Sequence, residues 1–294
     1  MIRLRPAAIS FAFLFCASFL LADCAQDHRD NKDGGILVTD FTISGTQTLS
    51  ATELAEITGD FIGACFNEDS DEMGERVRAL FQDRGYFTVE VKHLDFKPGD
   101  PLGNPKPVTM EADVTEGPRY KLADITFLNN HAFSAQRLRE VFPLKTGDVF
   151  GRSKVASGLE SLRNLYGKSG YLDFTAVPDT DFSSNATARL KVSVQEGPQY
   201  HMGKLEIAAA KESAGRLRLE WKLPEGAVYD SSYVNKFIDA NRDLLPTGFD
   251  RGSVQEALDC PHAAVDLKMI IDPAEDKSPQ LKRVPCESTN DDPK

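Results

Sequence analysis

The segment Glu-Gly-Pro-Arg-Tyr at residues 116–120 occurs a second time, as Glu-Gly-Pro-Gln-Tyr at residues 196–200. Both copies lead into an extended segment with alternating apolar residues, KLADI after the first and HMGKL after the second. The two copies are 80 residues apart (196 − 116 = 80). A fixed period of this kind is the sequence signature of repeat architectures. We therefore predict an array of copies of one small domain and not one large enzyme.

Two further landmarks repeat with similar spacing. A glycine followed two and three residues later by valine or cysteine and an aromatic residue occurs at Gly63, Gly147 and Gly226. Each is followed by a helical pattern that ends in glycine and an aromatic residue: Gly85-Tyr86, Gly170-Tyr171 and Gly248-Phe249. Because a helix that stops and turns into a strand favours a residue at positive φ, these glycines indicate helix ends. The chain therefore holds three copies.

The second copy shows the order of elements most clearly. Period-two and helical patterns predict a strand at 120–127, a short helix opened by Ser134 and closed by Pro143, a longer helix at 155–166, and strands at 171–177 and 188–194 joined by a polar turn at 179–185. The predicted fold class is α+β. It is a tandem array of three β-α-α-β-β domains, each a three-stranded sheet with two helices on one face.

This order, repeated with Glu-Gly-Pro at the seams, resembles the POTRA (polypeptide-transport-associated) domain over residues 36–272. In that family such arrays form the periplasmic arm of outer-membrane β-barrel assembly and translocation proteins. Members of the assembly-factor type end in a membrane barrel, whose smallest form needs about 8 strands of about 9–11 residues. Only 22 residues follow Asp272 (294 − 272 = 22), so we expect no barrel within this sequence.

The predicted boundaries follow from the repeat. They are a signal peptide at 1–25, POTRA-like domains at 36–118, 119–198 and 199–272, and a polar tail at 273–294. The signal has a positive region with Arg3 and Arg5, an apolar core at 7–22, and Asp23 as its end. We therefore expect export, with a periplasmic location that includes outer-membrane association.

The sequence leaves three outcomes open for the signal. Leu-Ala-Asp-Cys at residues 21–24 resembles a bacterial lipobox, in which Cys24 would be lipidated. Asp23 departs from that pattern, which has a small residue there. The second outcome is simple cleavage near Ala22 or Ala25, and the third is a retained N-terminal anchor.

Composition is that of a soluble, acidic protein. Hydrophobic residues make up 41% and charged residues 27% of the chain, which is ordinary for globular domains. The net charge of −11 argues against binding to nucleic acid and to anionic lipid. We therefore expect no nucleic-acid partner, and membrane association only through a partner or a lipid anchor.

An exported chain reaches an oxidising compartment, where cysteines can form disulfides. Cys65 stands where the sister copies have Val149 and Val228, so we predict a buried small hydrophobic residue there. Cys260 and Cys286 flank the last strand, and a disulfide between them would hold the tail against the third domain. The sequence leaves the free thiols as an equal alternative.

No catalytic or cofactor motif is present. The sequence contains no glycine-rich phosphate loop, no His-Glu-x-x-His, no Cys-x-x-Cys and no Gly-x-Ser-x-Gly. The histidines are dispersed, and Cys260-Pro-His262 is at best half of a metal site. We predict no catalytic residues, no metal and no cofactor. The histidines are His28, His93, His131, His201 and His262.

What such a domain offers a partner is the edge of its sheet, where backbone groups are unpaired and an extended peptide can add as a strand. The resemblance implies that the second strand of each unit is this edge, at residues 86–94, 171–177 and 249–257. The second of these has few charges, and we predict partner binding there, at Tyr171, Leu172, Asp173, Phe174, Thr175 and Val177.

Two functions remain open. The first is a periplasmic polypeptide-binding scaffold or accessory in outer-membrane protein assembly or translocation. Its partners would be outer-membrane proteins, a separate barrel subunit or unfolded polypeptide. The second is a structural adaptor that docks one fixed partner in an envelope complex. A scaffold would bind many extended peptides weakly, whereas an adaptor would bind one protein tightly.

Overall fold

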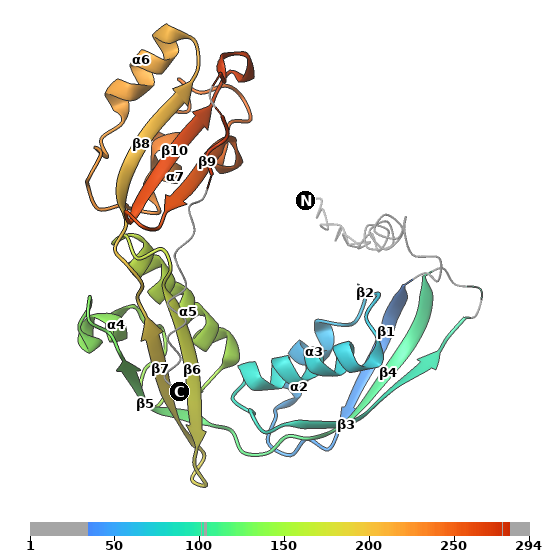
Figure 1. The fold of residues 1–294 in the computed structure, drawn as a ribbon. Coiled ribbons are helices and arrows are strands. Elements are labelled where there is room, and N and C mark those ends of the chain that lie inside the picture. The colour runs from blue at the N-terminus through green and yellow to red at the C-terminus, as the bar shows by residue number, and fades with distance from the viewer. Residues whose placement is uncertain (1–34, 101, 103–104, 278, 283–294) are drawn as a thin grey trace, which may run out of the picture. The chain divides into compact units, whose positions relative to one another are not determined.

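The structure is a computed structural model, and it describes residues 35–100, 102, 105–277 and 279–282. These residues form three small β-sheets, which Figure 1 shows in chain order as β1–β4, β5–β7 and β8–β10. By its internal contacts the chain divides into two compact units, one ending at Tyr120 and one beginning at Lys121. The second unit holds two of the three sheets.

Each repeat has the predicted order of strand, helix, helix, strand, strand. The first repeat consists of β1 (Ile36–Ser44), α2 (Ala51–Gly59), β2 (Cys65–Phe66), α3 (Ser70–Asp83), β3 (Glu90–Pro98) and β4 (Lys106–Thr115). The second consists of β5 (Lys121–Leu128), α4 (Ala135–Val141), α5 (Arg152–Gly167), β6 (Thr175–Phe182) and β7 (Thr187–Gln195). The third consists of β8 (His201–Ala208), α6 (Lys211–Glu220), α7 (Tyr233–Ala240), β9 (Val254–Asp259) and β10 (Ala264–Ile270), with the 3-10 turns η1 (Arg251–Ser253) and η2 (Pro273–Glu275).

The three sheets share one topology. The strand orders are β2-β1-β4-β3, β5-β7-β6 and β8-β10-β9. In each sheet the first and last long strands are parallel, and the second long strand lies antiparallel at the edge. The predicted fold class is confirmed, with one difference: the first sheet has a fourth, two-residue strand, β2, which pairs with the start of β1.

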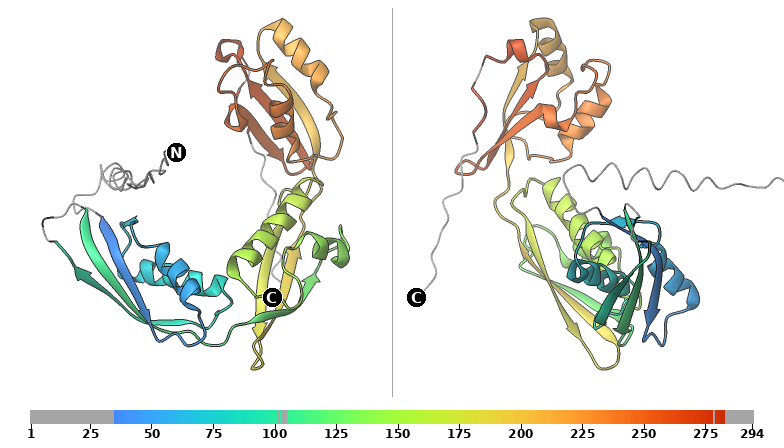
Figure 2. Two further views of the ribbon diagram at one scale, coloured as in Figure 1. Left: turned by 180° about the vertical axis from the view of Figure 1, so that it is seen from behind. Right: turned by 90° about the vertical axis from the view of Figure 1, so that its right-hand side faces the viewer.

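Alternation along the strands creates the cores. On β7, Ala188, Leu190, Val192 and Val194 are buried, whereas their neighbours Arg189 and Lys191 are exposed. The buried residues face the two helices of the repeat, which Figure 2 shows on one side of each sheet. Ser134 caps α4 as predicted, because its side chain accepts a hydrogen bond from the Arg137 N–H.

The glutamate of Glu-Gly-Pro fastens the last strand of a repeat to the loop before its first helix. In the second repeat, Glu196 Oε1 accepts hydrogen bonds from His131 N (2.8 Å), Ala132 N (2.9 Å) and the Tyr166 hydroxyl (2.9 Å). In the first repeat, Glu116 Oε1 accepts from the backbone (2.6 Å) and hydroxyl (2.7 Å) of Thr48. This shared contact explains why the glutamate recurs.

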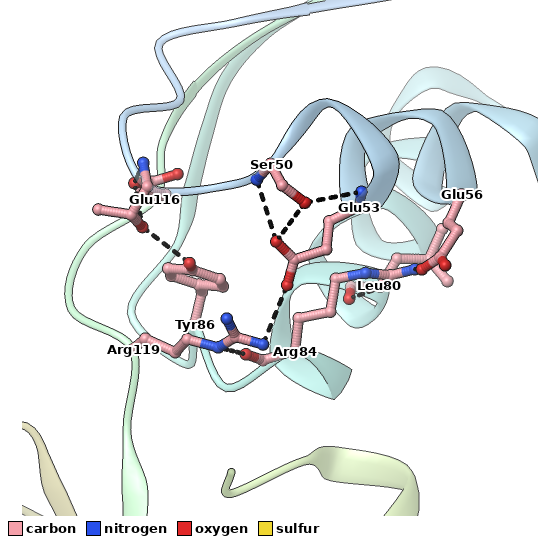
Figure 3. Close-up of polar contacts among 9 residues, drawn as sticks. Ser50, Glu53, Glu56, Leu80, Arg84, Tyr86, Glu116 and Arg119 are labelled. Atoms are coloured by element: carbon pink, nitrogen blue, oxygen red, sulfur yellow. Dashed lines mark hydrogen bonds and ion pairs between the residues drawn. The ribbon is translucent and has the colours of Figure 1, made fainter.

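The residues after the proline bind the end of the long helix. In the first repeat, the Arg119 guanidinium donates to the Arg84 carbonyl (2.9 Å) and pairs with Glu53 (3.0 Å), as Figure 3 shows. The Ser50 backbone, the Ser50 hydroxyl and Arg119 together lower the pKa of the Glu53 carboxyl. Tyr120 N then donates to the Gly85 carbonyl (2.9 Å).

The second seam repeats this arrangement with a different side chain. Gln199 Nε2 donates to the Ser169 carbonyl (3.0 Å), and Tyr200 N donates to the Gly170 carbonyl (2.8 Å). Gly85 and Gly170 have φ of 92° and 87°, which confirms the predicted glycine helix ends. A side chain at Gly170 would also collide with the Tyr200 carbonyl oxygen, 2.6 Å from an added Cβ.

The edge strands begin later than predicted. The structure places them at β3, β6 and β9, whereas we expected strands at 86–94, 171–177 and 249–257. The predicted polar turn at 179–185 is also wrong, because β6 continues through Asp179 and Asp181 to Phe182. The late start of the strands has one cause: an aromatic residue after each helix-end glycine packs in the core before the strand begins, namely Tyr86, Phe174 and Phe249.

Both described cysteines, Cys65 and Cys260, take part in disulfide bonds. The prediction that Cys65 is merely a buried hydrophobic residue is therefore wrong; it is half-buried and oxidised. The signal segment with Cys24, the residue His28 and the predicted disulfide partner Cys286 lie outside the described residues.

Candidate functional site

One edge of every sheet is partly closed by the recurring glycine-containing segment. In the second repeat, Gly147 N donates to the Leu122 carbonyl (2.8 Å) and Leu122 N to the Asp148 carbonyl (2.9 Å), so this segment pairs with the start of β5. The equivalent pairs are Gly63 N to Val38 O (2.8 Å) with Val38 N to Ala64 O (3.2 Å), and Gly226 N to Met202 O (2.7 Å) with Met202 N to Ala227 O (2.7 Å). The sequence showed this segment but not its function.

The opposite edge of each sheet is the second long strand, as the family resemblance implied. β3, β6 and β9 each pair with one neighbouring strand only among the described residues. An edge strand of this kind carries N–H and C=O groups that can pair with a further strand. The three edges differ in how accessible these groups are.

On β6, the even-numbered residues point their backbone groups away from β7. Ser183 N donates to the Thr187 carbonyl (2.9 Å), and the register from Thr175 to Phe182 has no irregularity. Because hydrogen-bonded pairs alternate in an antiparallel ladder, odd-numbered residues bond β7 and even-numbered ones face outward. Ala176 and Thr180 thus offer outward N–H groups, but Pro178 between them has none.

Four of the six predicted binding residues lie before this strand, in a turn. Phe174 is 3% exposed and stacks on Tyr166 with ring centroids 4.2 Å apart, and Tyr171 lies edge-on to the same ring at 5.7 Å. Leu172 packs against the core of the third repeat. Asp173 accepts a hydrogen bond from the Tyr200 hydroxyl (2.7 Å). These four residues hold the helix end and the second seam.

Thr175 and Val177 do lie on β6. Their side chains are exposed, and Val177 is 62% exposed. Their backbone groups point toward Gln195 and Ser193 of β7, so neither offers a backbone donor to a guest strand.

The edge of β3 has better access than that of β6. Gly99 N donates to the Pro107 carbonyl (2.8 Å), and the register is regular from Pro98 back to His93. By the same alternation, Leu94 and Phe96 point their backbone N–H groups outward, with no proline between them. No described group bonds to either N–H.

A groove runs between the start of β3 and the first half of α3. Its volume is about 340 Å³, and Gly74 of α3 lies in its wall; the wall also contains Ser70, Asp71, Glu75, Arg78, Val91, Lys92 and Leu94. A Cβ atom added at Gly74 would meet nothing within 4 Å. The second repeat has Leu159 at the equivalent position, the same distance before the helix-end glycine (85 − 74 = 11 and 170 − 159 = 11). The small residue at 74 therefore leaves room beside the β3 edge. A glycine within a helix was the sequence signal for it.

The described residues offer no constellation for metal binding. No group of three His, Cys, Asp or Glu side chains in the described part of the chain is placed to hold an ion. His262 Nδ1 lies 2.8 Å from an Asp259 carboxylate oxygen on an exposed hairpin, and Cys260 beside it is disulfide-bonded. His93 and His131 are exposed, and His201 lies at the start of β8.

None of the helices in residues 35–282 that the structure describes has the length and apolarity needed to cross a membrane.

Comparison with known proteins identifies the repeat. The POTRA family model, described as a surface antigen variable number repeat, matches residues 120–197. POTRA domains 3–5 of BamA from Haemophilus influenzae share the fold, with a TM-score of 0.56 and 21% identity over 80% of this chain and 94% of that one. Residues 120–197 therefore match the POTRA family, and the described repeats share the fold of tandem POTRA domains.

Two curated relatives are similar in sequence to this chain. One is a putative outer membrane protein assembly factor of Treponema pallidum, 27% identical over 175 residues, which are 58% of this chain and 20% of the relative. The other is the outer membrane protein assembly factor BamA of Neisseria meningitidis, 27% identical over 125 residues, which are 38% of this chain and 16% of the relative. The chain thus spans a fifth or less of the length of these relatives.

Proposed function

We propose that this protein is a periplasmic scaffold in outer-membrane protein assembly or translocation that binds extended polypeptide by adding it as a strand to a POTRA sheet. The observation that carries the proposal is the row of outward-facing backbone groups on the second long strand of each sheet. The other edge of each sheet is partly closed by the segment that contains Gly63, Gly147 or Gly226. Backbone pairing tolerates many guest sequences, which suits a protein that meets unfolded clients. The similarity to two assembly factors supports the same role.

Among the edges, we propose β3 as the main site. Its outward donors at Leu94 and Phe96 are uninterrupted, and the groove over Gly74 can receive a side chain of the guest. β6, where the sequence suggested binding at Tyr171–Val177, is proposed as a secondary site centred on Ala176 and Thr180. Pro178 and two aspartates, Asp179 and Asp181, limit access there, because proline and charge are devices that protect sheet edges.

We also propose a periplasmic location for the protein. Disulfide-bonded Cys65 and Cys260 support an oxidising compartment, which the periplasm is. Outer-membrane association would come from a partner, such as a separate barrel subunit. A lipid on Cys24 is the alternative route, and with Cys260 joined to Cys286 it would require Cys65 to form its disulfide with another chain. We propose no catalytic activity, since the described side chains fulfil structural roles at the seams and helix ends.

Gly74→Leu tests the main site. Leucine is a better helix former than glycine, so the fold should be retained or slightly stabilised. The new side chain should fill the groove and weaken binding of extended outer-membrane protein peptides at least about 10-fold, a change of roughly 1.4 kcal/mol. Fluorescence anisotropy measures the affinity and circular dichroism checks the fold.

Gly215→Leu is the matched control. Gly215 is also a helical glycine whose added Cβ would meet nothing within 4 Å, but it lies on α6 of the third repeat. Its substitution should leave peptide affinity unchanged. Equal binding by Gly74→Leu and the wild type would exclude the β3 groove as the site.

The adaptor alternative is decided by the range of partners. Weak binding of many unrelated extended peptides supports the scaffold. One tight protein partner, recovered from membranes together with this chain, would favour the adaptor.

A further inference from the structure

Lys268 is a fully buried cation on the face of the third sheet that lies away from the helices. Its neighbours on β10, Leu267 and Met269, belong to the core, so Lys268 points to the opposite face. A lysine on the middle strand of a bare sheet face would reach water, yet its exposure is 0%. The chain after β10 covers it.

The covering segment is the strap, which we define as residues 272–277 and 279–282. It begins where Asp272 N donates to the Ala208 carbonyl (3.0 Å), and Asp272 then caps the turn η2. Asp276 Oδ1 lies 2.5 Å from Lys268 Nζ, and that amine also donates to the Pro279 carbonyl (3.3 Å). Figure 2 (right) shows the coloured part of the chain after β10 on the side of the sheet opposite α7.

The strap crosses a polar row that runs from strand to strand. Glu206 of β8 and Gln255 of β9 are the register partners of Lys268 on its two sides. Glu206 Oε1 lies 3.7 Å from the amine, and Gln255 Oε1 accepts a hydrogen bond from the Leu281 N–H (3.4 Å). In this row, the Lys268 amine can bind a carboxylate, and the Gln255 side-chain oxygen can accept a hydrogen bond from a backbone N–H.

The groups that bind the strap could bind a similar segment of another protein in the same way. We propose that the row Glu206–Lys268–Gln255 is a docking site for an extended acidic segment of a partner protein, and that the strap is its resident occupant. A buried amine requires an anionic partner, which sets the carboxylate as the main determinant. The strap is exchangeable because, among the described residues, none beyond Ile271 belongs to the core cluster of this repeat. Lys277, Pro279 and Gln280 of the strap are exposed.

The test uses the full-length mature chain and a fluorescent peptide with the sequence of residues 272–282. In the wild type, the tethered strap competes at an effective concentration on the order of millimolar, so the peptide should bind weakly. Asp276→Ala removes the competing carboxylate and should tighten peptide binding at least about 10-fold. Asp272→Ala, which removes the cap of η2 and leaves Asp276 in place, should also tighten it.

Two controls identify the determinant. A peptide with alanine at the position of Asp276 should not bind, and Lys268→Met in the Asp276→Ala chain should abolish binding of the original peptide. Unchanged affinity in both opened variants, with a retained fold, overturns the proposal, as does equal binding of the alanine peptide. Loss of the fold in both variants also overturns it, because the strap would then be part of the domain and not an occupant.

Discussion

Tyr229 shows how a single buried group can oppose stability. Its ring is 0% exposed, and its hydroxyl has no hydrogen-bond partner among the described residues. An unsatisfied buried polar group costs about 1–3 kcal/mol. We therefore expect Tyr229→Phe to raise the free energy of unfolding by about 1 kcal/mol, measured by urea denaturation. A loss of stability would show that the hydroxyl is solvated or paired.

The same residue predicts a dependence on pH. Burial, opposed by Arg251 and assisted by Asp230, raises the pKa of Tyr229 to about 12. The folded state thus favours the neutral phenol, whose stabilising effect is complete below the unfolded pKa of about 10 and is lost as pH rises toward 12. The loss of stability between pH 10 and 12 should be smaller in Tyr229→Phe than in the wild type.

Glu196 contributes in the opposite direction. Its carboxylate accepts from two backbone N–H groups and the Tyr166 hydroxyl, so we expect Glu196→Ala to lower the free energy of unfolding by about 2–3 kcal/mol. Glu160→Ala is the control, because Glu160 forms only exposed contacts, an ion pair with Arg163 and a hydrogen bond from Asn164, and should change stability by less than about 0.5 kcal/mol. Similar effects of the two substitutions would contradict the role assigned to the motif.

At the scale of the strand, backbone direction decides the effect of proline on β6. Thr175 bonds Gln195, so Thr175→Pro should break the ladder and destabilise the fold by about 1–3 kcal/mol. The backbone N–H of Thr180 points away from β7, at a position of the same kind as the native Pro178. Thr180→Pro should therefore leave thermal stability nearly unchanged, but it should remove a backbone donor for guest strands. Thermal unfolding and peptide binding by both variants check this. Equal destabilisation would mean that the alternation is assigned incorrectly.

The strand example also shows how far the sequence leads. Period two indicated a strand near residue 171, and Gly170 marked the helix end correctly. However, a residue such as Phe174 looks the same whether it begins a strand or packs on Tyr166, because both environments favour an aromatic side chain. The direction of each N–H depends on pairing register, which is set by contacts between strands distant in sequence.

The groove and the strap lie beyond sequence reasoning for a similar reason. Gly74 could be noticed as a helical glycine, but its location beside β3 depends on how α3 packs on the sheet. In the sequence, Lys268 occupies a position on the polar side of an alternating strand, where a lysine is ordinarily exposed. Only the return of the chain over that face makes it buried.

At the scale of the whole molecule, the disulfides are the main test of the periplasmic assignment. Cys65 and Cys260 should be oxidised in the exported protein, and we predict that Cys260 is joined to Cys286. Peptide mapping by mass spectrometry without reduction measures both. A free thiol at Cys65 or Cys260 in the mature protein, or a different partner for Cys260, would contradict this prediction.

The two seams use the same joint: the N–H of the first tyrosine of the following repeat bonds the carbonyl of the glycine at the preceding helix end. This bond joins two backbone groups, so it does not depend on the side chains of the repeats before and after it. A unit inserted after Pro198, beginning with tyrosine and ending with Glu-Gly-Pro, would find both of its connections already provided. The length of such a protein can therefore change by whole units, through duplication or loss of a gene segment, with the backbone bond of each new seam already specified by the repeat.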